Sequence, residues 1–171
     1  MLENDKTKER VERHKITQED FTPNEIIKLM VMDLGDEYYT DFSKTILDTS
    51  CGIGNILLYV LNKRLENTST MIEGLKAIKT LYGVEIMADN VEECRNRLYN
   101  TLIEKYPQIK DNKLYDNGLK TLLKNRIRWY DSLKFDYKWE RINGVEENVS
   151  FAEPNINNSE KYPMWTDENE L

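Results

Sequence analysis

The feature that most restricts the fold is a short apolar segment that leads into a glycine turn and then into a helical pattern. Thr45-Ile46-Leu47-Asp48 is typical of a buried strand, and the turn that follows it contains Gly52 and Gly54. From Ile56 to Leu65 apolar residues recur at helical spacing. Ligands of parallel α/β sheets bind beyond the carboxyl ends of the strands, where such turns lie next to a helix N-terminus.

The same alternation of strand and helix continues along the chain. Strands are predicted at 81–86 and 126–131, and Val149–Ala152 is a candidate for a fourth short strand. Strands that alternate with helices indicate an α/β fold with a doubly wound, mostly parallel sheet, here with a reduced number of strands. Helices are predicted at residues 71–79, from a cap at Asp89 to about Ile103, and at 113–124.

An N-terminal helix is predicted before the first strand. Thr22 is the expected N-cap, Pro23 suits the first helical position, and Gly35 ends the helix. One buried stripe is expected on this helix, formed by Ile26, Ile27, Met30, Val31 and Leu34. A polar, aromatic connection then leads to the first strand.

The 171 residues are enough for one domain with a hydrophobic core. We expect a charged N-terminal arm at 1–20, the folded domain at 21–152 and an acidic tail at 153–171. No apolar run approaches the ~20 residues of a membrane span, so the protein is expected in the cytoplasm without a membrane partner. The two cysteines, Cys51 and Cys94, are expected to be free thiols, and with one histidine, His14, no metal site is predicted.

Charge is distributed unevenly along the chain. The net charge is −7, which argues against a surface that holds nucleic acid all over. Lys110–Arg141 nevertheless carries nine Lys/Arg against five Asp/Glu, whereas residues 143–171 carry seven acids and one lysine. The basic and aromatic stretch at 126–141 could contact a nucleic acid backbone, and it is also consistent with an amphipathic strand whose charges face solvent.

Two further acids are expected at the carboxyl edge of the sheet. Glu85 ends the second predicted strand, where a carboxylate can accept hydrogen bonds from both ribose hydroxyls of an adenosine ligand. Asp131 ends the third predicted strand, where it could accept from an adenine amino group. Each acid is also consistent with a merely exposed strand end. Leu57 replaces the third glycine of the dinucleotide fingerprint, which disfavours a nicotinamide oxidoreductase.

These motifs resemble the class I S-adenosylmethionine-dependent methyltransferases, in particular the adenine-specific DNA methyltransferases related to modification subunits of restriction systems. Asp48–Asn55 is similar to the family's Asp-Pro-Ala-Cys-Gly-x-Gly loop, with Thr49 for the proline and Ser50 for the alanine. Phe21-Thr22-Pro23 is similar to its Phe-Thr-Pro motif. Tyr82–Ile86 resembles its ribose motif, and Asp131-Ser132-Leu133 resembles its adenine-side motif.

The resemblance covers residues 16–135 and implies an S-adenosylmethionine site. Asp48 and the backbone at the two glycines would lie near the methionine group, Glu85 on the ribose, and Ile86 with Asp131 at the adenine. Cys51 would be a small packing residue rather than a nucleophile. The implied cofactor-binding residues are Phe21, Thr22, Pro23, Asp48, Ser50, Cys51, Gly52, Gly54, Asn55, Glu85, Ile86, Asp131, Ser132 and Leu133.

The chain departs from this family at the methyl-acceptor site, where the family has a Pro-Pro-aromatic motif. All four prolines of the chain are isolated, and the nearest candidate for this position is Glu153-Pro154-Asn155. Two hypotheses therefore stand. The chain is a DNA adenine methyltransferase with DNA as its partner, or it is a catalytically incomplete, cofactor-binding or regulatory module that needs a partner chain to complete the sheet or acceptor site.

Overall fold

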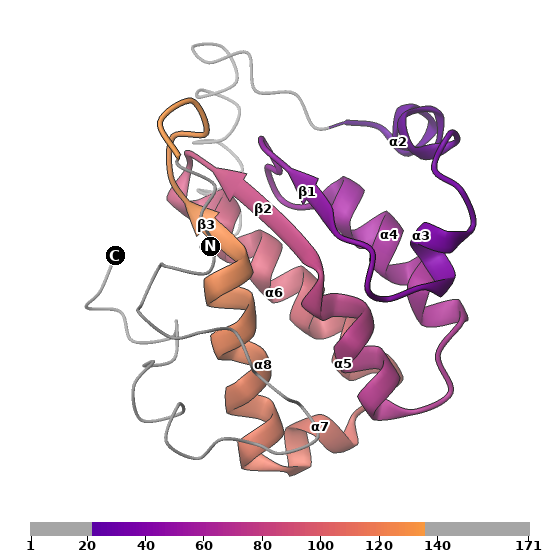
Figure 1. Ribbon diagram of the computed structural model, residues 1–171. Helices are drawn as coiled ribbons and strands as arrows, with labels where there is room; N and C mark the ends of the chain where they lie inside the picture. The colour runs from indigo at the N-terminus through magenta and orange to yellow at the C-terminus, as the bar shows by residue number, and fades with distance from the viewer. Residues whose placement is uncertain (1–21, 136–171) are drawn as a thin grey trace, which may run out of the picture.

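The structure is a computed structural model that describes residues 22–135 (Figure 1). Several predictions fall outside these residues: the arm at 1–20, Phe21 of the Phe-Thr-Pro motif, the candidate strand at 149–152, the acceptor candidates Glu153, Pro154 and Asn155, and the tail at 153–171.

The described sheet has three parallel strands in the order β1-β2-β3. The strands are β1 (Ile46–Asp48), β2 (Leu81–Glu85) and β3 (Ile127–Trp129). In their register Asp48 lies opposite Gly83, and Glu85 lies opposite Trp129. The predicted α/β class with a parallel sheet is thus confirmed. Because the strands are parallel, the ends of β1 and β2 lie at the same edge.

Helices connect each strand to the next. The connection from β1 to β2 is made by α4 (Asn55–Glu66) and α5 (Met71–Lys79), and that from β2 to β3 by α6 (Ala88–Lys105), α7 (Gln108–Asp111) and α8 (Lys113–Arg126). Both connections step across the sheet in the same direction, so right-handed crossovers place both on one face. Figure 1 shows α4 and α6 behind the sheet. Within residues 22–135, the helices that connect the strands therefore cover this one face of the sheet.

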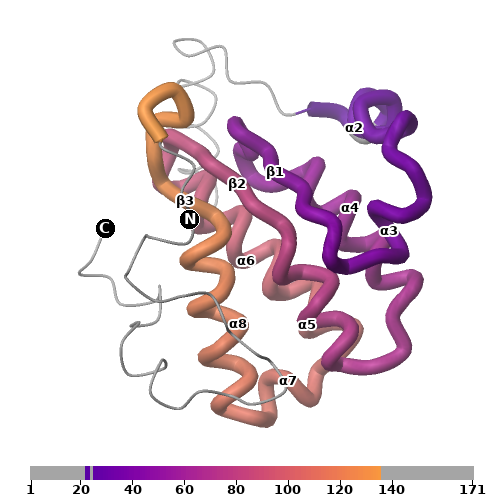
Figure 2. The backbone as a smooth tube through the Cα atoms, in the orientation of Figure 1, coloured from indigo at the N-terminus to yellow at the C-terminus, as the bar shows by residue number. Residues whose placement is uncertain are grey.

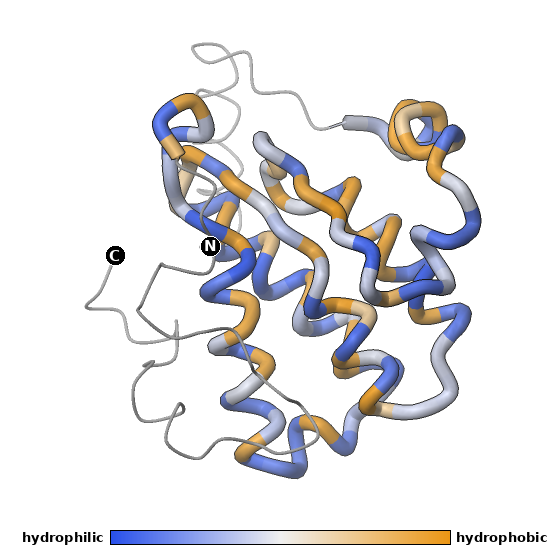
Figure 3. The backbone as a smooth tube through the Cα atoms, viewed as in Figure 1, coloured by the Kyte–Doolittle hydropathy of each residue, from blue (hydrophilic) through white to orange (hydrophobic). Residues whose placement is uncertain are grey.

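A single apolar core joins these helices to the sheet. Each helix contributes an inner stripe, as the alternating colours along α4, α6 and α8 in Figure 3 show. Fully burying one such leucine contributes about 1.5–3 kcal/mol relative to its exposure. Figure 2 shows the chain passing from α8 into β3 without a loop, because α8 ends at Arg126 and β3 begins at Ile127. Fully buried members of the core include Leu57, Leu61, Leu75, Leu81, Leu98, Leu102, Leu119 and Ile127.

The N-terminal helix α2 (Asn24–Val31) differs from its prediction in three ways. It ends at Val31, with Met32 as its C-cap, rather than at Gly35. Its N-cap residue is Pro23 in an extended conformation, and no side chain caps the helix, so Thr22 is not the cap. Of the predicted buried stripe only Ile27 and Val31 are buried, whereas Ile26 and Met30 are exposed. Among the described helices the main neighbour of α2 is α4, and one narrow side of the helix is enough for that contact.

Smaller differences concern the ends of elements. Asp89 lies in the first turn of α6 rather than at its cap, which is Met87; an acid there still opposes the positive end of the helix dipole. The predicted connection before β1 contains a short helix, α3 (Glu37–Thr40), and α7 follows Pro107. Strand β3 ends at Trp129, so Asp131 lies beyond the strand rather than at its end. No helix in the described part of the chain is both long and apolar enough to cross a bilayer.

Candidate functional site

The glycine turn lies at the carboxyl edge of the sheet and is folded back onto β2. The Cys51 N–H donates to the carbonyl of Val84 across 3.0 Å, and the Gly54 N–H donates to the carbonyl of Cys51. Gly52 and Gly54 both have left-handed backbone angles, with φ of 51° and 83°. Glycine adopts this conformation without the steric cost that a Cβ atom brings. The turn therefore needs both glycines for its path.

The two glycines differ in what surrounds them. A Cβ atom on Gly54 would lie 2.5 Å from the Cys94 Sγ, so this glycine allows the start of α4 to pack against α6. A Cβ atom on Gly52 would meet nothing within 4 Å. The backbone at Gly52 is thus open to close approach by a ligand, whereas Gly54 serves internal packing.

A buried carboxylate connects the turn to the end of β2. The Gly52 N–H donates to Glu85 Oε2 across 2.9 Å, and the Met87 N–H donates to Glu85 Oε1 across 2.8 Å. The Glu85 residue is only 6% exposed. Each carboxylate oxygen can accept more than one hydrogen bond, so acceptor capacity remains for hydroxyl donors of a ligand. The structure thus brings Gly52 and Glu85, predicted from separate motifs, into direct contact.

A second carboxylate lies at the same edge. Asp48 Oδ1 accepts from the Ser50 N–H across 3.2 Å. Burial raises the pKa of the Asp48 carboxyl above its ordinary value, and the negative charge of Glu85 raises it further. The N–H groups of Cys51, Gly52 and Gly54 already have acceptors within the chain. This edge therefore favours a cation or hydroxyl donors and disfavours a phosphate, which requires free N–H groups and positive potential.

The Cys51 side chain packs beneath the turn. Its thiol is buried and forms a hydrogen bond with the Cys94 thiol, which, together with desolvation, holds the pKa of Cys51 far above its ordinary value. A Cβ atom on Gly83 would lie 2.7 Å from the Cys51 Sγ, so glycine at that position makes room for the sulfur. A buried, protonated thiol is a poor nucleophile, as expected for a packing residue.

Arg97 on α6 supports the glycine turn, and no motif in the sequence predicted this role. Its Nη1 donates to the Ile53 carbonyl across 2.7 Å and to Asn55 Oδ1 across 2.8 Å. The Asn55 amide in turn donates to the carbonyl of Thr22 across 3.4 Å, a long hydrogen bond. The chain around the predicted Phe-Thr-Pro motif is thus connected to the glycine turn through Asn55. A basic residue beside an apolar stripe is an ordinary feature of a helix, so no sequence signal distinguishes Arg97.

A polar groove of about 430 Å³ runs between α4 and α6 on their outer side. Of the predicted cofactor-binding residues only Asn55 lines it, so this groove is distinct from the edge formed by Gly52 and Glu85. Its lining residues are Asn55, Leu58, Tyr59, Asn62, Arg97, Asn100, Thr101 and Glu104.

The predicted adenine side is less closely assembled. Ile86 is exposed, and its carbonyl accepts from Trp129 Nε1 across 2.9 Å. The Asp131 carboxylate accepts from the Leu133 N–H and pairs with Lys134 within its own turn. These contacts lower the pKa of Asp131 below its ordinary value. The Asp131 carboxylate therefore stabilises the turn in which it lies, and the Leu133 side chain projects into solvent.

The basic and aromatic stretch is described only as far as residue 135. Arg126 is buried, donates to the Lys79 carbonyl across 2.8 Å and stacks over the Tyr82 ring at 4.5 Å. Arg126 thus has a structural role and does not present its charge to a phosphate. Trp129 and Tyr130 are exposed.

The described residues define an α/β protein with a carboxylate-rich edge at the ends of its first two strands. Comparison with known proteins adds no relative: no family model, curated protein or solved structure matches the chain.

Proposed function

We propose that the chain binds S-adenosylmethionine at the carboxyl edge of β1 and β2 and transfers its methyl group to the amino group of adenine in DNA. The observation that carries this proposal is the contact of the Glu85 carboxylate with the Gly52 N–H, at the ends of two adjacent parallel strands. In α/β sheets this is the position at which an acidic residue holds the ribose of an adenosine ligand.

The residues at this edge suit the chemistry of that cofactor. Glu85 retains lone pairs for the two ribose hydroxyls, and the open backbone at Gly52 permits close approach of the ligand. The carboxylates of Asp48 and Glu85 stabilise positive charge, which a sulfonium carries. A dinucleotide or nucleoside triphosphate would instead place phosphates beside two carboxylates, which is unfavourable.

Methyl transfer demands alignment more than covalent chemistry from the protein. When bound, the cofactor supplies an activated methyl group on its sulfonium sulfur. The chain's own residues would hold the ribose at Glu85 and position the cofactor beside the glycine turn, which Arg97 supports. Glu153, Pro154 and Asn155 remain the proposed acceptor-site residues, with DNA as the partner and restriction-modification as the proposed setting.

We also propose the full sheet as a doubly wound, Rossmann-like methyltransferase sheet, of which α4 and α6 cover one side. Strand β1 has a described neighbour on one side only, since it pairs with β2. A free strand edge is a site for further pairing. This edge favours the second candidate function, in which a partner chain completes the sheet and acceptor site of a cofactor-binding module.

Calorimetric titration with S-adenosylmethionine tests the cofactor. Glu85→Gln removes the charge while keeping most of the shape, and it should weaken binding about tenfold or more. Glu66→Gln at the exposed end of α4, away from the carboxyl edge, is the matched control and should leave the affinity unchanged. Equal affinities of wild type and Glu85→Gln, or tighter binding of a nicotinamide dinucleotide than of S-adenosylmethionine, would contradict the assignment.

Transfer of labelled methyl groups to unmethylated DNA separates the two candidate functions. The enzyme hypothesis expects label in DNA from the chain alone, with RNA and protein as comparison acceptors. Cofactor binding without transfer by the chain alone would favour the module that needs a partner.

A further inference from the structure

Helix α2 has one wide apolar face, and the domain buries only one flank of it. Ile27 and Val31 are buried. The rest of this face and the residue that follows the helix are exposed: Ile26, Leu29, Met30 and Met32 are 45%, 60%, 60% and 67% exposed. We call these four residues the outer face of α2. The apolar face of an amphipathic helix normally packs against a core.

This exposure is unusual within the described part of the chain. Helices α3 to α8 contribute no large apolar side chain to the exposed set of residues 22–135. In Figure 3 orange dominates the turn of α2, whereas blue and orange alternate along α8. The contact of α2 with the domain uses the flank that carries Ile27 and Val31, so the domain's own core does not account for the outer face. Several large apolar side chains exposed on one short helix are typical of an interaction site.

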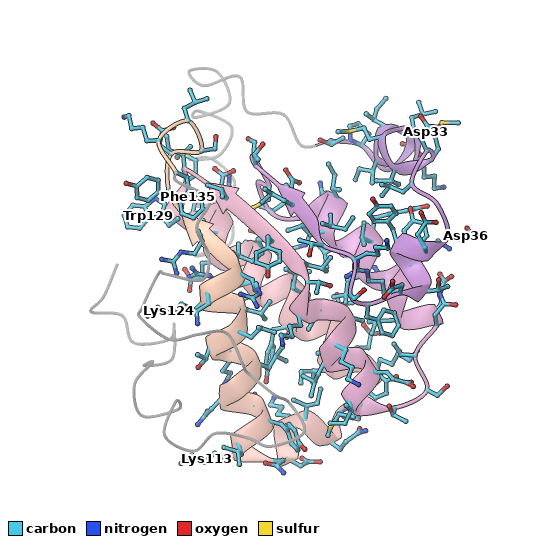
Figure 4. All side chains as sticks on the ribbon, in the orientation of Figure 1. Asp33, Asp36, Lys113, Lys124, Trp129 and Phe135 are labelled. Atoms are coloured by element: carbon cyan, nitrogen blue, oxygen red, sulfur yellow. The ribbon has the colours of Figure 1, made fainter. Side chains whose placement is uncertain are left out.

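The surroundings of the outer face are acidic. Residues 22–43 carry five acids, all exposed, and one lysine, Lys28. Figure 4 shows Asp33 and Asp36 beside α2 and α3, and the labelled Lys113 and Lys124 on the other side of the molecule. A partner that covers this face therefore gains from positive charge around its own apolar stripe. The five acids are Glu25, Asp33, Asp36, Glu37 and Asp41.

Residues 143–171 carry seven acids against one lysine, so like charges oppose their binding beside Asp33 and Asp36. Residues 1–20 carry six acids against five Lys/Arg and have few apolar side chains. The complementary chemistry, an apolar stripe flanked by lysine and arginine, is that of a basic amphipathic helix.

We propose that the outer face of α2 docks a basic amphipathic helix of a partner protein. Apolar anchors at positions i, i+3 and i+4 on such a helix can bury Leu29 and Met30, while its lysines lie near Asp33 and Asp36. Methionine side chains adapt to partners of different shape, which suits Met30 and Met32 to such a surface.

Fluorescence anisotropy with a labelled leucine and lysine peptide of about five helical turns tests the proposal. The wild-type chain should bind this peptide in preference to one with glutamate in place of lysine, and to one whose scrambled order removes the apolar stripe. The double variant Leu29→Gln/Met30→Gln should weaken binding about tenfold or more. Both side chains are exposed, so circular dichroism should show an unchanged fold.

Two further variants sharpen the test. Leu133→Gln alters another exposed apolar side chain, away from α2, and should leave peptide affinity unchanged. Asp33→Asn/Asp36→Asn should weaken binding several-fold and flatten its dependence on salt. Equal binding of the basic and acidic peptides would overturn the proposal. So would sedimentation that shows a wild-type dimer and a monomeric Leu29→Gln/Met30→Gln variant, because the face would then be a contact between copies of this chain.

Discussion

The two edges of the sheet both contain buried charge, but of opposite sign and with different numbers of partners. At the amino edge Arg64 is fully buried, and at the carboxyl edge Glu85 is nearly so. Arg64 donates to chain carbonyls and a hydroxyl, whereas Glu85 accepts from chain N–H groups. Comparing the two shows which edge is structural and which is open to a ligand.

At the amino edge Arg64 joins the segments that precede β1 and β2. Its Nε donates to Tyr38 O, its Nη1 to Ala77 O and Thr80 Oγ1, and its Nη2 to Lys44 O, at distances of 2.7–2.9 Å. Burial lowers the pKa of Arg64 to about 10, which still leaves it charged at neutral pH. Two further buried arginines act similarly: Arg126 donates to Lys79 O, and Arg95 donates to Ile127 O.

The polarity of the backbone explains this difference. Helices that precede a strand end at the amino edge with free carbonyls, and helices that follow a strand begin at the carboxyl edge with free N–H groups. The buried arginines donate hydrogen bonds to carbonyls at the amino edge. Glu85 accepts from two of the N–H groups at the carboxyl edge and retains acceptor capacity. The backbone of Gly52 beside it is open to a ligand. The buried charge at the amino edge therefore stabilises the fold, while the carboxyl edge retains acceptor groups that can bind a ligand.

The largest expected effect is at the amino edge. Arg64→Met removes the donors of four hydrogen bonds and leaves buried carbonyls without partners, so the free energy of unfolding should fall by about 3–5 kcal/mol. Urea denaturation measures this. Lys63→Ala, on the neighbouring half-buried residue that pairs with Glu66 at the surface, is the control and should cost less than about 1 kcal/mol. Comparable losses of unfolding free energy from both variants would contradict the structural role of Arg64.

The next effect separates the two glycines. Gly54→Ala places a Cβ atom 2.5 Å from Cys94 Sγ in a left-handed conformation, which should cost about 2–4 kcal/mol of stability. Gly52→Ala meets no neighbour and should cost about 1 kcal/mol from backbone strain alone. The comparison uses thermal unfolding monitored by circular dichroism. A Gly52 variant as destabilised as the Gly54 variant would contradict the open backbone at Gly52.

A smaller loss is expected from Glu85→Gln. The amide oxygen can keep one backbone N–H as a donor, but its NH₂ group faces the other, so stability should fall by about 1–3 kcal/mol. Hydrogen exchange at the Gly52 and Met87 amides should become faster, whereas the amide of Leu98 in the core should not change. Unchanged protection at both amides would show that Glu85 does not hold the turn.

The smallest effect has the opposite sign. The pKa of Asp48 is raised in the folded state, so its contribution to stability is present below its ordinary value of 3.8 and is lost as pH rises through the raised pKa. Asp48→Asn should therefore stabilise the chain at neutral pH by less than about 1 kcal/mol. The gain should vanish towards acid pH. Melting temperatures across pH 3–8 measure this, and a gain independent of pH would exclude the titration of Asp48 as its cause.

Much of the fold could be predicted because its signals are local. The glycine turn after Asp48 and the helical spacing that follows it each span few residues, and β1, α4, α5 and β2 were found within one or two residues of their predicted bounds. The prediction for α2 was wrong in its detail, since periodicity shows which residues share a face but not how wide a face the domain covers. The predicted end of β3 was also wrong. Asp131 lies in a turn, where its carboxylate accepts from the Leu133 N–H, and in the sequence such a turn resembles the end of a strand.

The sequence by itself determined the α/β class, the parallel strands and the presence of Gly52 and Glu85 at the ends of β1 and β2, because chain direction and short-range periodicity dictate these. Only the tertiary structure decided that Glu85 would accept from Gly52, 33 residues earlier in the chain, and that Gly54 would face Cys94. It also decided that Arg64 would close the amino edge and that the outer face of α2 would stay exposed. These outcomes depend on which atoms meet across the fold, and packing between distant segments leaves no periodic signal in the sequence.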